Sequence, residues 1–517
     1  MDIFMNMIQA LINPQLVLYL AVGVFLGIYI GAVPGLSVTM AASLLISFTY
    51  SWDVLPAMAA MVGIYIGGVY GGSRSAILLN IPGAPAAVAT ALDGYPLAQK
   101  GLAGQAIGVT VVQSVLGGLI GTIVLAVGAP AVTKIAITFA PRDYFLLAVM
   151  GLLLIGSLGT ESPARGVMSA AIGIFIGFIG IDSQTGHMRF VIGPSGSTFR
   201  TYMTLGVNYV VVMIGLFGMS EALIQLRDMS VKPVKQKVNK IVPGWKNILK
   251  YLPLSIRTSL LGTFVGALPG TGGDIAALMA YDHAKRSTKN PEVPFGEGAI
   301  EGLVACESAN NAAIGGACIP MLTLGIPGDA VTAIMIGAMY IHGLNPGPLL
   351  MKNSADVFWY IIGAMFVGNI FLLIFGFSGI KLFAKIVEVP KHILMPIIII
   401  LSVVGAFSIN NNLMDVYWMI FFGILGYLMK LYHFPVASAI LGIILVDLIE
   451  LNFRRAALTV GNSLAALAAD LLSHPISLVL LVVIVCMTLS SAGVFKKLHG
   501  MAKKPSVQNQ KAQTEGN

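Results

Sequence analysis

The sequence predicts an all-α polytopic membrane protein with about 12–14 membrane segments in two inverted repeats, with broken or re-entrant helices and an extra C-terminal helix. Two observations predict this class. Of the 517 residues, 57% are hydrophobic and only 10% are charged, and the mean hydropathy is +0.88, whereas a soluble domain carries about 25% charged residues. In addition, apolar stretches interrupted by proline and glycine recur at matching places in the two halves.

Long apolar runs supply the predicted membrane segments. Each approaches or reaches the roughly 20 residues that a helix needs to cross a bilayer. The runs are Gln15–Val33, Gly104–Val127, Tyr144–Leu158, Tyr209–Phe217, Phe358–Phe377 and Pro475–Val494. Because no soluble domain is inserted between them, any cargo is recognised within the membrane region or by a separate partner.

The basic residues indicate how the chain is oriented. The net charge is +8, and the segment Arg227–Lys250 holds seven Lys/Arg residues and one acid. The tail after Val494 is also basic. Short basic segments beside membrane helices mark the cytoplasmic side, so both are placed inside. A nucleic-acid partner is not expected, because the chain has no folded basic domain.

Two long-range matches divide the chain into repeats. Residues 27–35 and 262–270 share five identical residues, and the Ile-Pro-Gly of Ile81–Gly83 recurs as Ile326–Gly328. Order and spacing are kept, which predicts homologous halves. The expected parts are a first membrane repeat (1–226), a basic linker (227–251), a second repeat (252–474), an additional C-terminal transmembrane helix (475–496) and a cytoplasmic tail (497–517).

The Pro-Gly motif of the second repeat predicts a re-entrant hairpin. The apolar stretches on either side, Thr258–Leu268 and Thr271–Tyr281, have 11 residues each, too short to cross about 30 Å at 1.5 Å per residue. Both outer ends are basic, at Arg257 and at Lys285 and Arg286. The hairpin is therefore expected to enter and leave on the cytoplasmic side, with Pro269 and Gly270 at its tip.

A helix broken inside a membrane exposes backbone groups that can bind ions. Pro269 ends the helix and Gly270 allows positive φ, and the freed groups must be buried in protein or line a polar site. Carbonyls at the end of one half-helix suit a small cation, while N–H groups at the start of the next suit an anion. Two repeats with such breaks are typical of secondary transporters.

Several polar side chains near the breaks have a structural and a functional interpretation. Asp274 is a candidate cation ligand, but Thr271–Asp274 also fits a capping box. Arg74 could hold a substrate carboxylate, or it could snorkel to the membrane interface or meet a buried acid. Ser308, Asn310 and Asn311 either face a ligand or pack helices together. Glu307 and Asp329 are either site acids or residues at helix starts, and the three cysteines are expected to be buried structural thiols.

These motifs resemble the large membrane subunit (TctA type) of the tripartite tricarboxylate transporters. The resemblance rests on the two Pro-Gly motifs, YGGSRSAILLNIPG from Tyr70, GALPGTGGDIAALMAYDHAKR from Gly266, the stretch from Glu307 to Met339 and GLNPGPLL from Gly343. It implies a secondary transporter of the bacterial inner membrane that imports di- or tricarboxylates such as citrate with a cation, of which Na⁺ is the expected one. It also implies a small membrane subunit (TctB type) and a periplasmic solute-binding protein (TctC type) as partners. No cofactor is expected.

Carried over to this chain, the resemblance places the site at the two hinges, the two Ile-Pro-Gly turns and two polar stretches. The expected substrate-binding residues are Pro34, Gly35, Leu36, Ser37, Ser73, Arg74, Ser75, Pro82, Gly83, Pro269, Gly270, Thr271, Gly272, Gly273, Pro327 and Gly328. The expected cation-binding residues are Ser37, Asp274, Ser308, Asn310 and Asn311.

Two alternatives belong to other functional classes. An intramembrane aspartyl protease needs two facing acids, but Asp274 and Asp282 lie eight residues apart on one predicted helix, with Thr271 where that motif needs glycine. An anion channel fits two converging hinge-bearing halves less well than alternating access does. The sequence lacks a nucleotide-binding P-loop, so transport is expected to draw on an ion gradient or on a partner.

Overall fold

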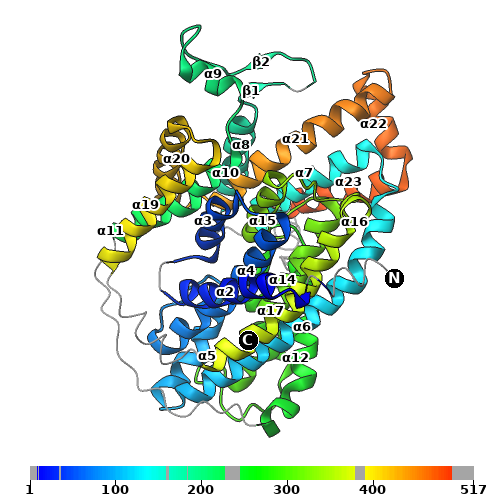
Figure 1. The fold of residues 1–517 in the computed structure, drawn as a ribbon. Helices are drawn as coiled ribbons and strands as arrows, with labels where there is room; N and C mark the ends of the chain where they lie inside the picture. Colours follow the sequence, from blue (N-terminus) through cyan, green and yellow to red (C-terminus); the bar gives the residue numbers. More distant parts are fainter. Residues whose placement is uncertain are drawn as a thin grey trace, which may run out of the picture.

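The computed structural model describes residues 9, 11–33, 36–158, 162–182, 184–227, 245–378 and 391–491. Nearly all of the regular structure is helical (Figure 1), with one two-stranded ribbon, β1 (Gly180–Ile181) and β2 (Met188–Arg189). Pro34 and Gly35 of the predicted first hinge, the predicted cytoplasmic tail 497–517 and residues 228–244 of the predicted linker lie outside the described residues.

The helices fall on either side of the basic linker. Before it lie α2 (Pro14–Ala32), α3 (Val38–Thr49), α4 (Val54–Leu79), α5 (Ala87–Gln99), α6 (Ala103–Ala136), α7 (Pro141–Leu158), α8 (Pro163–Gly177), α9 (Thr198–Thr204), α10 (Tyr209–Met213), the π-helical turn η1 (Ile214–Met219) and α11 (Ser220–Arg227). After it lie α12 (Trp245–Gly266), α13 (Gly272–Ser287), α14 (Ile300–Leu324), α15 (Ala330–Ile341), α16 (Leu350–Asn353), α17 (Ala355–Ser378), α19 (Lys391–Asn410), α20 (Leu413–Leu431), α21 (Val436–Thr459), α22 (Leu464–Ser473) and α23 (Pro475–Ser491).

The long apolar helices are those of a multi-pass membrane protein. Among the described residues, eight spans are long and apolar enough to cross a membrane, or nine if the bent pair of α22 and α23 counts as one. This is fewer than the 12–14 segments that the sequence predicts, and α3, α8 and α15 are apolar but shorter. The predicted C-terminal span corresponds to α23, which meets α22 at an angle of 100°.

Glycines let two pairs of helices pack backbone against backbone. In the pair α2 and α4, a Cβ atom added at Gly31 would lie 2.3 Å from the carbonyl oxygen of Gly68. In the pair α12 and α14, a Cβ at Gly266 would lie 2.4 Å from the carbonyl oxygen of Ala313. Small residues permit this close approach of membrane helices. Gly31 and Gly266 occupy the same position in the two matching sequence motifs.

The second Pro-Gly motif breaks the chain between α12 and α13, as the sequence predicts. Gly270 and Gly272 have φ values of 79° and 56°, a region that residues with a Cβ atom rarely adopt. The two helices form a hairpin whose open end is joined by an ion pair of 2.5 Å between Lys250 Nζ and Glu292 Oε1.

The capping box considered for Thr271 and Asp274 is wrong. Thr271 precedes α13 with helical backbone angles and makes no side-chain capping bond. Its hydroxyl donates to the carbonyls of Val265 and Leu268 at the end of α12. Thr271 therefore satisfies carbonyl groups at the end of α12. Asp274 takes no part in a capping box.

The two Ile-Pro-Gly turns follow α4 and α14 and have the same local structure. Each helix ends on a left-handed residue, Asn80 at φ 55° and Gly325 at φ 71°. A Cβ added at Gly83 would lie 2.2 Å from the carbonyl oxygen of Gly31, and one added at Gly328 would lie 2.8 Å from that of Gly266. Each turn therefore packs against the helix that precedes the corresponding Pro-Gly motif.

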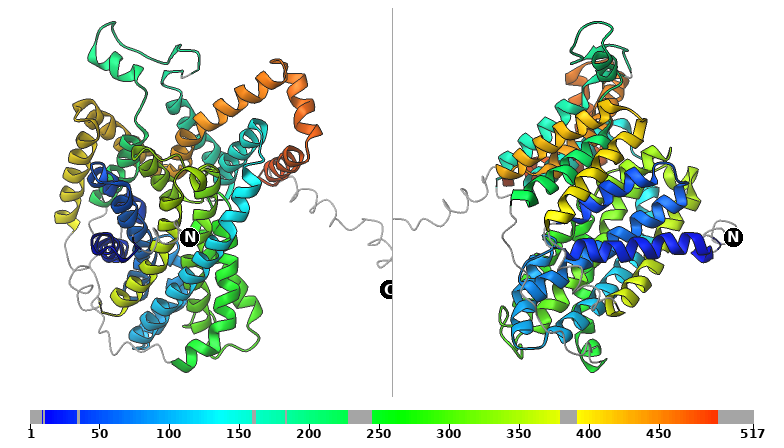
Figure 2. Two further views of the ribbon diagram at one scale, coloured as in Figure 1. Left: turned by 45° about the vertical axis from the view of Figure 1, so that its right-hand side comes forward. Right: turned by 60° about the vertical axis from the view of Figure 1, so that its left-hand side comes forward.

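An excursion between α8 and α10 projects from one end of the helical body. It contains β1, β2 and α9, and the left-hand view of Figure 2 shows it extending beyond the neighbouring helices. In Figure 1, α5 and the start of α12 lie at the opposite end.

Candidate functional site

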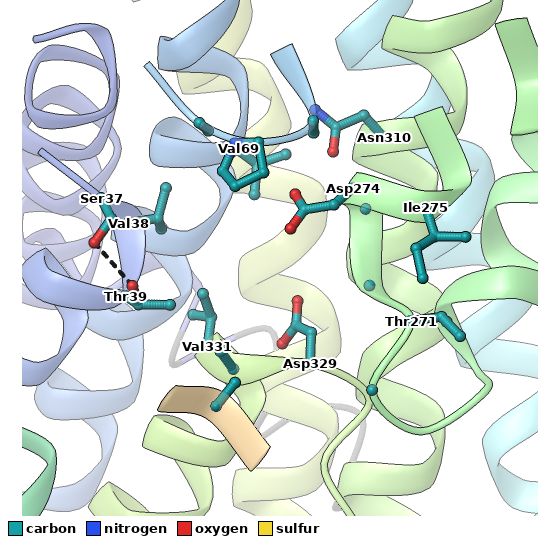
Figure 3. A pocket seen from close by; sticks show the side chains of 18 of the residues that line it. Ser37, Val38, Thr39, Val69, Thr271, Asp274, Ile275, Asn310, Asp329 and Val331 are labelled. Atoms are coloured by element: carbon teal, nitrogen blue, oxygen red, sulfur yellow. Dashed lines mark hydrogen bonds between the residues drawn. The ribbon is translucent and has the colours of Figure 1, made fainter. Parts of the chain in front are cut away.

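A cavity of about 850 Å³ lies where the second hinge meets the start of α3. Figure 3 shows side chains from α3, the hinge, α14 and the start of α15 around one open space. Residues of α4, α21 and the loop before α5 complete the wall. The polar or hinge residues among those that line it are Ser37, Thr39, Tyr65, Gly270, Thr271, Gly272, Gly273, Asp274, Asn310, Asp329 and Ser438.

Five helices begin at this cavity: α3, α5, α13, α15 and α21. Ser37 caps α3, because its hydroxyl accepts the N–H of Met40 at 3.1 Å, and it lies 2.8 Å from the Thr39 hydroxyl. The helix α13 begins at Gly272, and α15 begins after its cap Asp329. The N-terminus of a helix carries unpaired N–H groups and a partial positive charge, so the backbone of this cavity favours negatively charged groups.

Two carboxylates point into the same space (Figure 3) and have different surroundings. Asp329 is held by a capping box, in which Oδ1 accepts the N–H of Thr332 at 2.8 Å, and its Oδ2 accepts a hydrogen bond from the Tyr65 hydroxyl. Asp274 lies in the first turn of α13 and its side chain is exposed to the cavity. Asp329 is therefore held by its own helix and by Tyr65, while Asp274 accepts a backbone hydrogen bond from Ala86 and faces the cavity.

Close packing fixes Asn310 beside the hinge. The residue Asn310 is 2% exposed. A Cβ atom added at Gly273 would lie 2.2 Å from its side-chain oxygen. Only glycine at position 273 leaves that oxygen where it is. Asp274, Asn310 and Ser37, which are three of the five residues expected to bind a cation, all line this one cavity.

The residues that line this cavity include two acids and, within the described part of the chain, no Lys, Arg or His. Side-chain and carbonyl oxygens are the ligands that hard cations prefer. The side-chain oxygens of the lining therefore suit a hard cation, while the helix N-termini suit an anion.

Other predicted site residues lie outside the cavity. Ser308 hydrogen-bonds the Thr258 hydroxyl at 2.7 Å, and the Asn311 amide donates to the Glu307 carbonyl at 3.4 Å. Both are fully buried. The residues of the predicted site that are described but do not line the cavity are Leu36, Ser73, Arg74, Ser75, Pro82, Gly83, Pro269, Ser308, Asn311, Pro327 and Gly328.

Arg74 is buried inside the helical body. It has no exposed surface, and its Nη2 donates to the carbonyls of Phe375 (3.1 Å) and Gly376 (2.7 Å) in the last turn of α17. The guanidinium also lies over the ring of Tyr70, 5.3 Å from its centre. A cation near a helix C-terminus stabilises the helix dipole. This geometry favours the structural interpretation of Arg74.

Replacing Arg74 by methionine is therefore expected to destabilise the protein rather than to weaken substrate binding. Hydrogen bonds to a charged group contribute about 1.5–3 kcal/mol each, so we expect a lower melting temperature of the purified protein. The apparent affinity of the remaining folded protein for substrate should match that of the wild type. If Arg74→Met instead shows a large rise in the half-saturating substrate concentration and an unchanged melting temperature, Arg74 binds the substrate.

Sequence reasoning missed three polar residues of the cavity wall: Thr39, Tyr65 and Ser438. Thr39 could have been found, because it follows the Ser37 cap in a short apolar helix. Tyr65 and Ser438 lie within long apolar stretches on α4 and α21. Nothing in their local sequence sets them apart from residues that only pack.

A second cavity, of about 930 Å³, lies beside the excursion between α8 and α10. Arg189 on β2 pairs with Glu450 of α21 at 2.8 Å, and Arg454 pairs with Asp182 at 2.8 Å. Hydrogen bonds from the Thr185 hydroxyl and the Gln184 N–H, together with Arg454, hold the pKa of Asp182 below its usual range. These charges bind one another and anchor the excursion to α21.

Comparisons with known proteins give a consistent result. The sequence pattern of the tripartite tricarboxylate transporter TctA family matches residues 17–441. A 52.8 kDa protein of Agrobacterium vitis, described as uncharacterized and encoded in the TAR-I ttuC' 3' region, is 36% identical over 462 residues, or 88% of this chain and 90% of that protein. An uncharacterized protein from the TAR-II ttuC' 3' region of the same organism is 43% identical over 195 residues, or 38% of this chain and 80% of that protein.

Proposed function

Because this chain belongs to the tripartite tricarboxylate transporter TctA family, we propose that it imports a di- or tricarboxylate together with a cation, Na⁺ being the preferred candidate. The family is one of transporters and not of enzymes, so the intramembrane protease alternative is excluded. Asp282 pairs with Arg286 at 2.8 Å and does not face Asp274 across a site. Membership of a tripartite family implies a small membrane subunit, a solute-binding protein and a carboxylate substrate.

The cavity between the hinges is the proposed substrate site. The main observation in support of this site is that α3, α13 and α15 all begin at this one cavity. Their first N–H groups can donate to carboxylate oxygens, and helix N-termini are recurrent anion sites. A volume of about 850 Å³ is sufficient for a small organic acid and several waters.

The absence of a basic side chain in the described lining supports cation coupling. An anion that enters a low-dielectric site without charge compensation costs many kcal/mol. A cation held by Asp274, Asn310 and Ser37 would supply that compensation at the same cavity. Ser308 and Asn311, buried beside α12 and Glu307, would then position α14 instead of binding the ion.

We further propose that the two halves are inverted repeats that alternate access to this cavity. The pairs α2–α4 and α12–α14 pack through glycines at corresponding positions, and the turns after α4 and α14 pack against the same glycines, Gly31 and Gly266. Such symmetry is typical of transporters that open alternately to the two sides of the membrane. The bacterial inner membrane, with the C-terminus in the cytoplasm, is the corresponding location.

Uptake by proteoliposomes tests this function. The full chain would be reconstituted with its small membrane subunit and solute-binding protein and supplied with labelled carboxylates, with and without an inward sodium gradient. We expect accumulation of at least one di- or tricarboxylate above its outside concentration, dependent on the sodium gradient. Equilibration without accumulation would indicate an anion channel, and accumulation without any cation gradient would exclude coupling.

A further inference from the structure

Glu307 is enclosed by hydroxyl groups from three other helices. It lies on α14 with no exposed surface. Its Oε1 accepts hydrogen bonds from Ser73 of α4 at 2.6 Å and Thr90 of α5 at 2.5 Å, and its Oε2 accepts one from Ser114 of α6 at 2.8 Å. We call these four residues the Glu307 cage. None of them lines the cavity between the hinges.

The distances within the cage define what it can hold. Oxygen–oxygen separations of 2.5–2.8 Å are those of O–H···O hydrogen bonds. Hydroxyl hydrogens therefore occupy the space between the carboxylate and its neighbours. A proton on the carboxylate fits this arrangement without moving a helix, whereas a metal ion would have to displace the hydroxyls.

The described hydrogen-bond partners of the Glu307 carboxylate are all neutral hydroxyl groups. An ionised carboxylate in a membrane interior is costly, and hydrogen bonds that its three hydroxyl partners donate offset part of that cost. Protonation removes the charge but gives up the advantage of those donors. The hydrogen bonds favour the ionised form, and burial in the membrane interior favours the neutral form. Because neither form is excluded, the carboxyl group can bind and release a proton reversibly.

Other ionisable groups surround the cage without contacting the carboxylate directly. On α4 the guanidinium of Arg74 donates to carbonyls of α17. The neighbouring side chains of α6 and α12 are neutral. Gln113 of α6 accepts a hydrogen bond from the Ser255 hydroxyl of α12 at 2.5 Å, and Thr258 also lies on α12. The ionisable neighbours from the packed helices are Tyr70 and Arg74 of α4, Asp93 of α5, Tyr281 of α13 and Cys306 of α14.

We propose that Glu307 binds a proton in one state of the transport cycle and releases it in another, an inference that rests on the proposed transport function. On binding, an O–H bond forms at Oε2 and the negative charge is neutralised. The new O–H donates to Ser114 Oγ, and the Ser114 hydroxyl turns to a backbone carbonyl one turn earlier, an acceptor that helical serines commonly use. The proton comes from water and returns to it.

The cage is connected to the cavity wall along two helices. Asn310, which lines the cavity, follows Glu307 by about one turn of α14. Thr90 lies in the first turn of α5, directly after the cavity residues Ala84, Pro85 and Ala86. A change in the hydrogen bonds of the cage therefore acts on two parts of the cavity wall.

Infrared spectroscopy of the purified full chain tests proton binding without any substrate. A protonated carboxyl group gives a distinct C=O band, and we expect part of this band in the wild type to disappear on pH titration. The same component should be missing from Glu307→Gln and present in Asp282→Asn, which alters an exposed acid on α13. An identical titrating band in the wild type and Glu307→Gln would overturn the proposal.

Two further variants keep the carboxyl group, in case Glu307→Gln does not fold. Thr90→Val and Ser114→Ala each remove one hydroxyl donor, so the pH at which the band disappears should shift in both. An unchanged titration in both variants would contradict proton binding in the cage.

Proton movement during transport tests the role in the cycle. In proteoliposomes with both partner subunits, the wild type should change the internal pH when citrate is added, and Glu307→Gln should lose that change while keeping citrate–citrate exchange. Citrate-dependent proton movement by Glu307→Gln would overturn the role. If the wild type moves none of the tested carboxylates but its band still titrates, the proposed function fails and the proton site stands.

Discussion

Replacing Asp274 by asparagine is expected to weaken sodium-driven accumulation of substrate strongly. Asp274 is the acid whose side chain is exposed to the cavity and is not engaged in a capping box. The amide keeps the size of the side chain but removes the negative charge that would hold the cation. Interactions with a charged group contribute about 1.5–3 kcal/mol, so the sodium concentration for half-maximal uptake should rise by about tenfold or more.

The matched control for this variant is Asp282→Asn. Asp282 lies on the same helix, is exposed and pairs with Arg286 at 2.8 Å. It should leave uptake and its sodium dependence unchanged. The measurement is initial uptake as a function of sodium concentration, with equal amounts of reconstituted protein. Normal sodium activation in Asp274→Asn would show that the cation binds elsewhere in the chain or to a partner subunit.

Replacing Gly266 by valine is expected to prevent the second half from packing. An added Cβ would lie 2.4 Å from the carbonyl oxygen and 2.8 Å from the Cα of Ala313, and backbone atoms cannot rotate out of the way. Overpacking of a tight contact costs about 1–3 kcal/mol and sometimes more. We expect a strongly reduced yield of folded protein, a lower melting temperature and no measurable uptake.

The control is Phe264→Leu, two residues earlier on α12. Phe264 is 66% exposed, so its side chain faces away from α14 and the change should leave the melting temperature nearly unaltered. Melting curves of both variants in the same detergent make the comparison. A Gly266→Val protein that melts like the wild type would show that α12 and α14 can separate without loss of stability.

Features set by short stretches of sequence were predictable. Pro269 and Gly270 interrupt a helix through their own backbone chemistry, so the break between α12 and α13 could be placed from a few residues. The hinge cavity contains Gly270, Thr271, Gly272, Gly273 and Asp274 for the same reason. The position of the break therefore follows from the local sequence, although the capping of α13 does not.

Features set by distant parts of the chain were not predictable. Arg74 meets the carbonyls of Phe375 and Gly376, which lie about 300 residues later in the sequence, so its motif could not reveal that it is turned away from the hinges. The Glu307 cage likewise joins residues more than 190 positions apart. Thr271 has a capping motif, yet its hydroxyl binds the helix behind it, because the tight turn brings those carbonyls within reach.

The helix α6 is longer than the hydrocarbon layer is thick, so bilayer thickness influences its orientation. Its 34 residues extend about 51 Å, whereas the hydrocarbon layer is about 30 Å thick, and the cyan helix runs obliquely through the left-hand view of Figure 2. Such a helix has to tilt or to extend past the acyl chains. Ser114 on α6 donates a hydrogen bond to Glu307. The tilt of the helix that supports this buried carboxylate is therefore expected to differ between thin and thick bilayers.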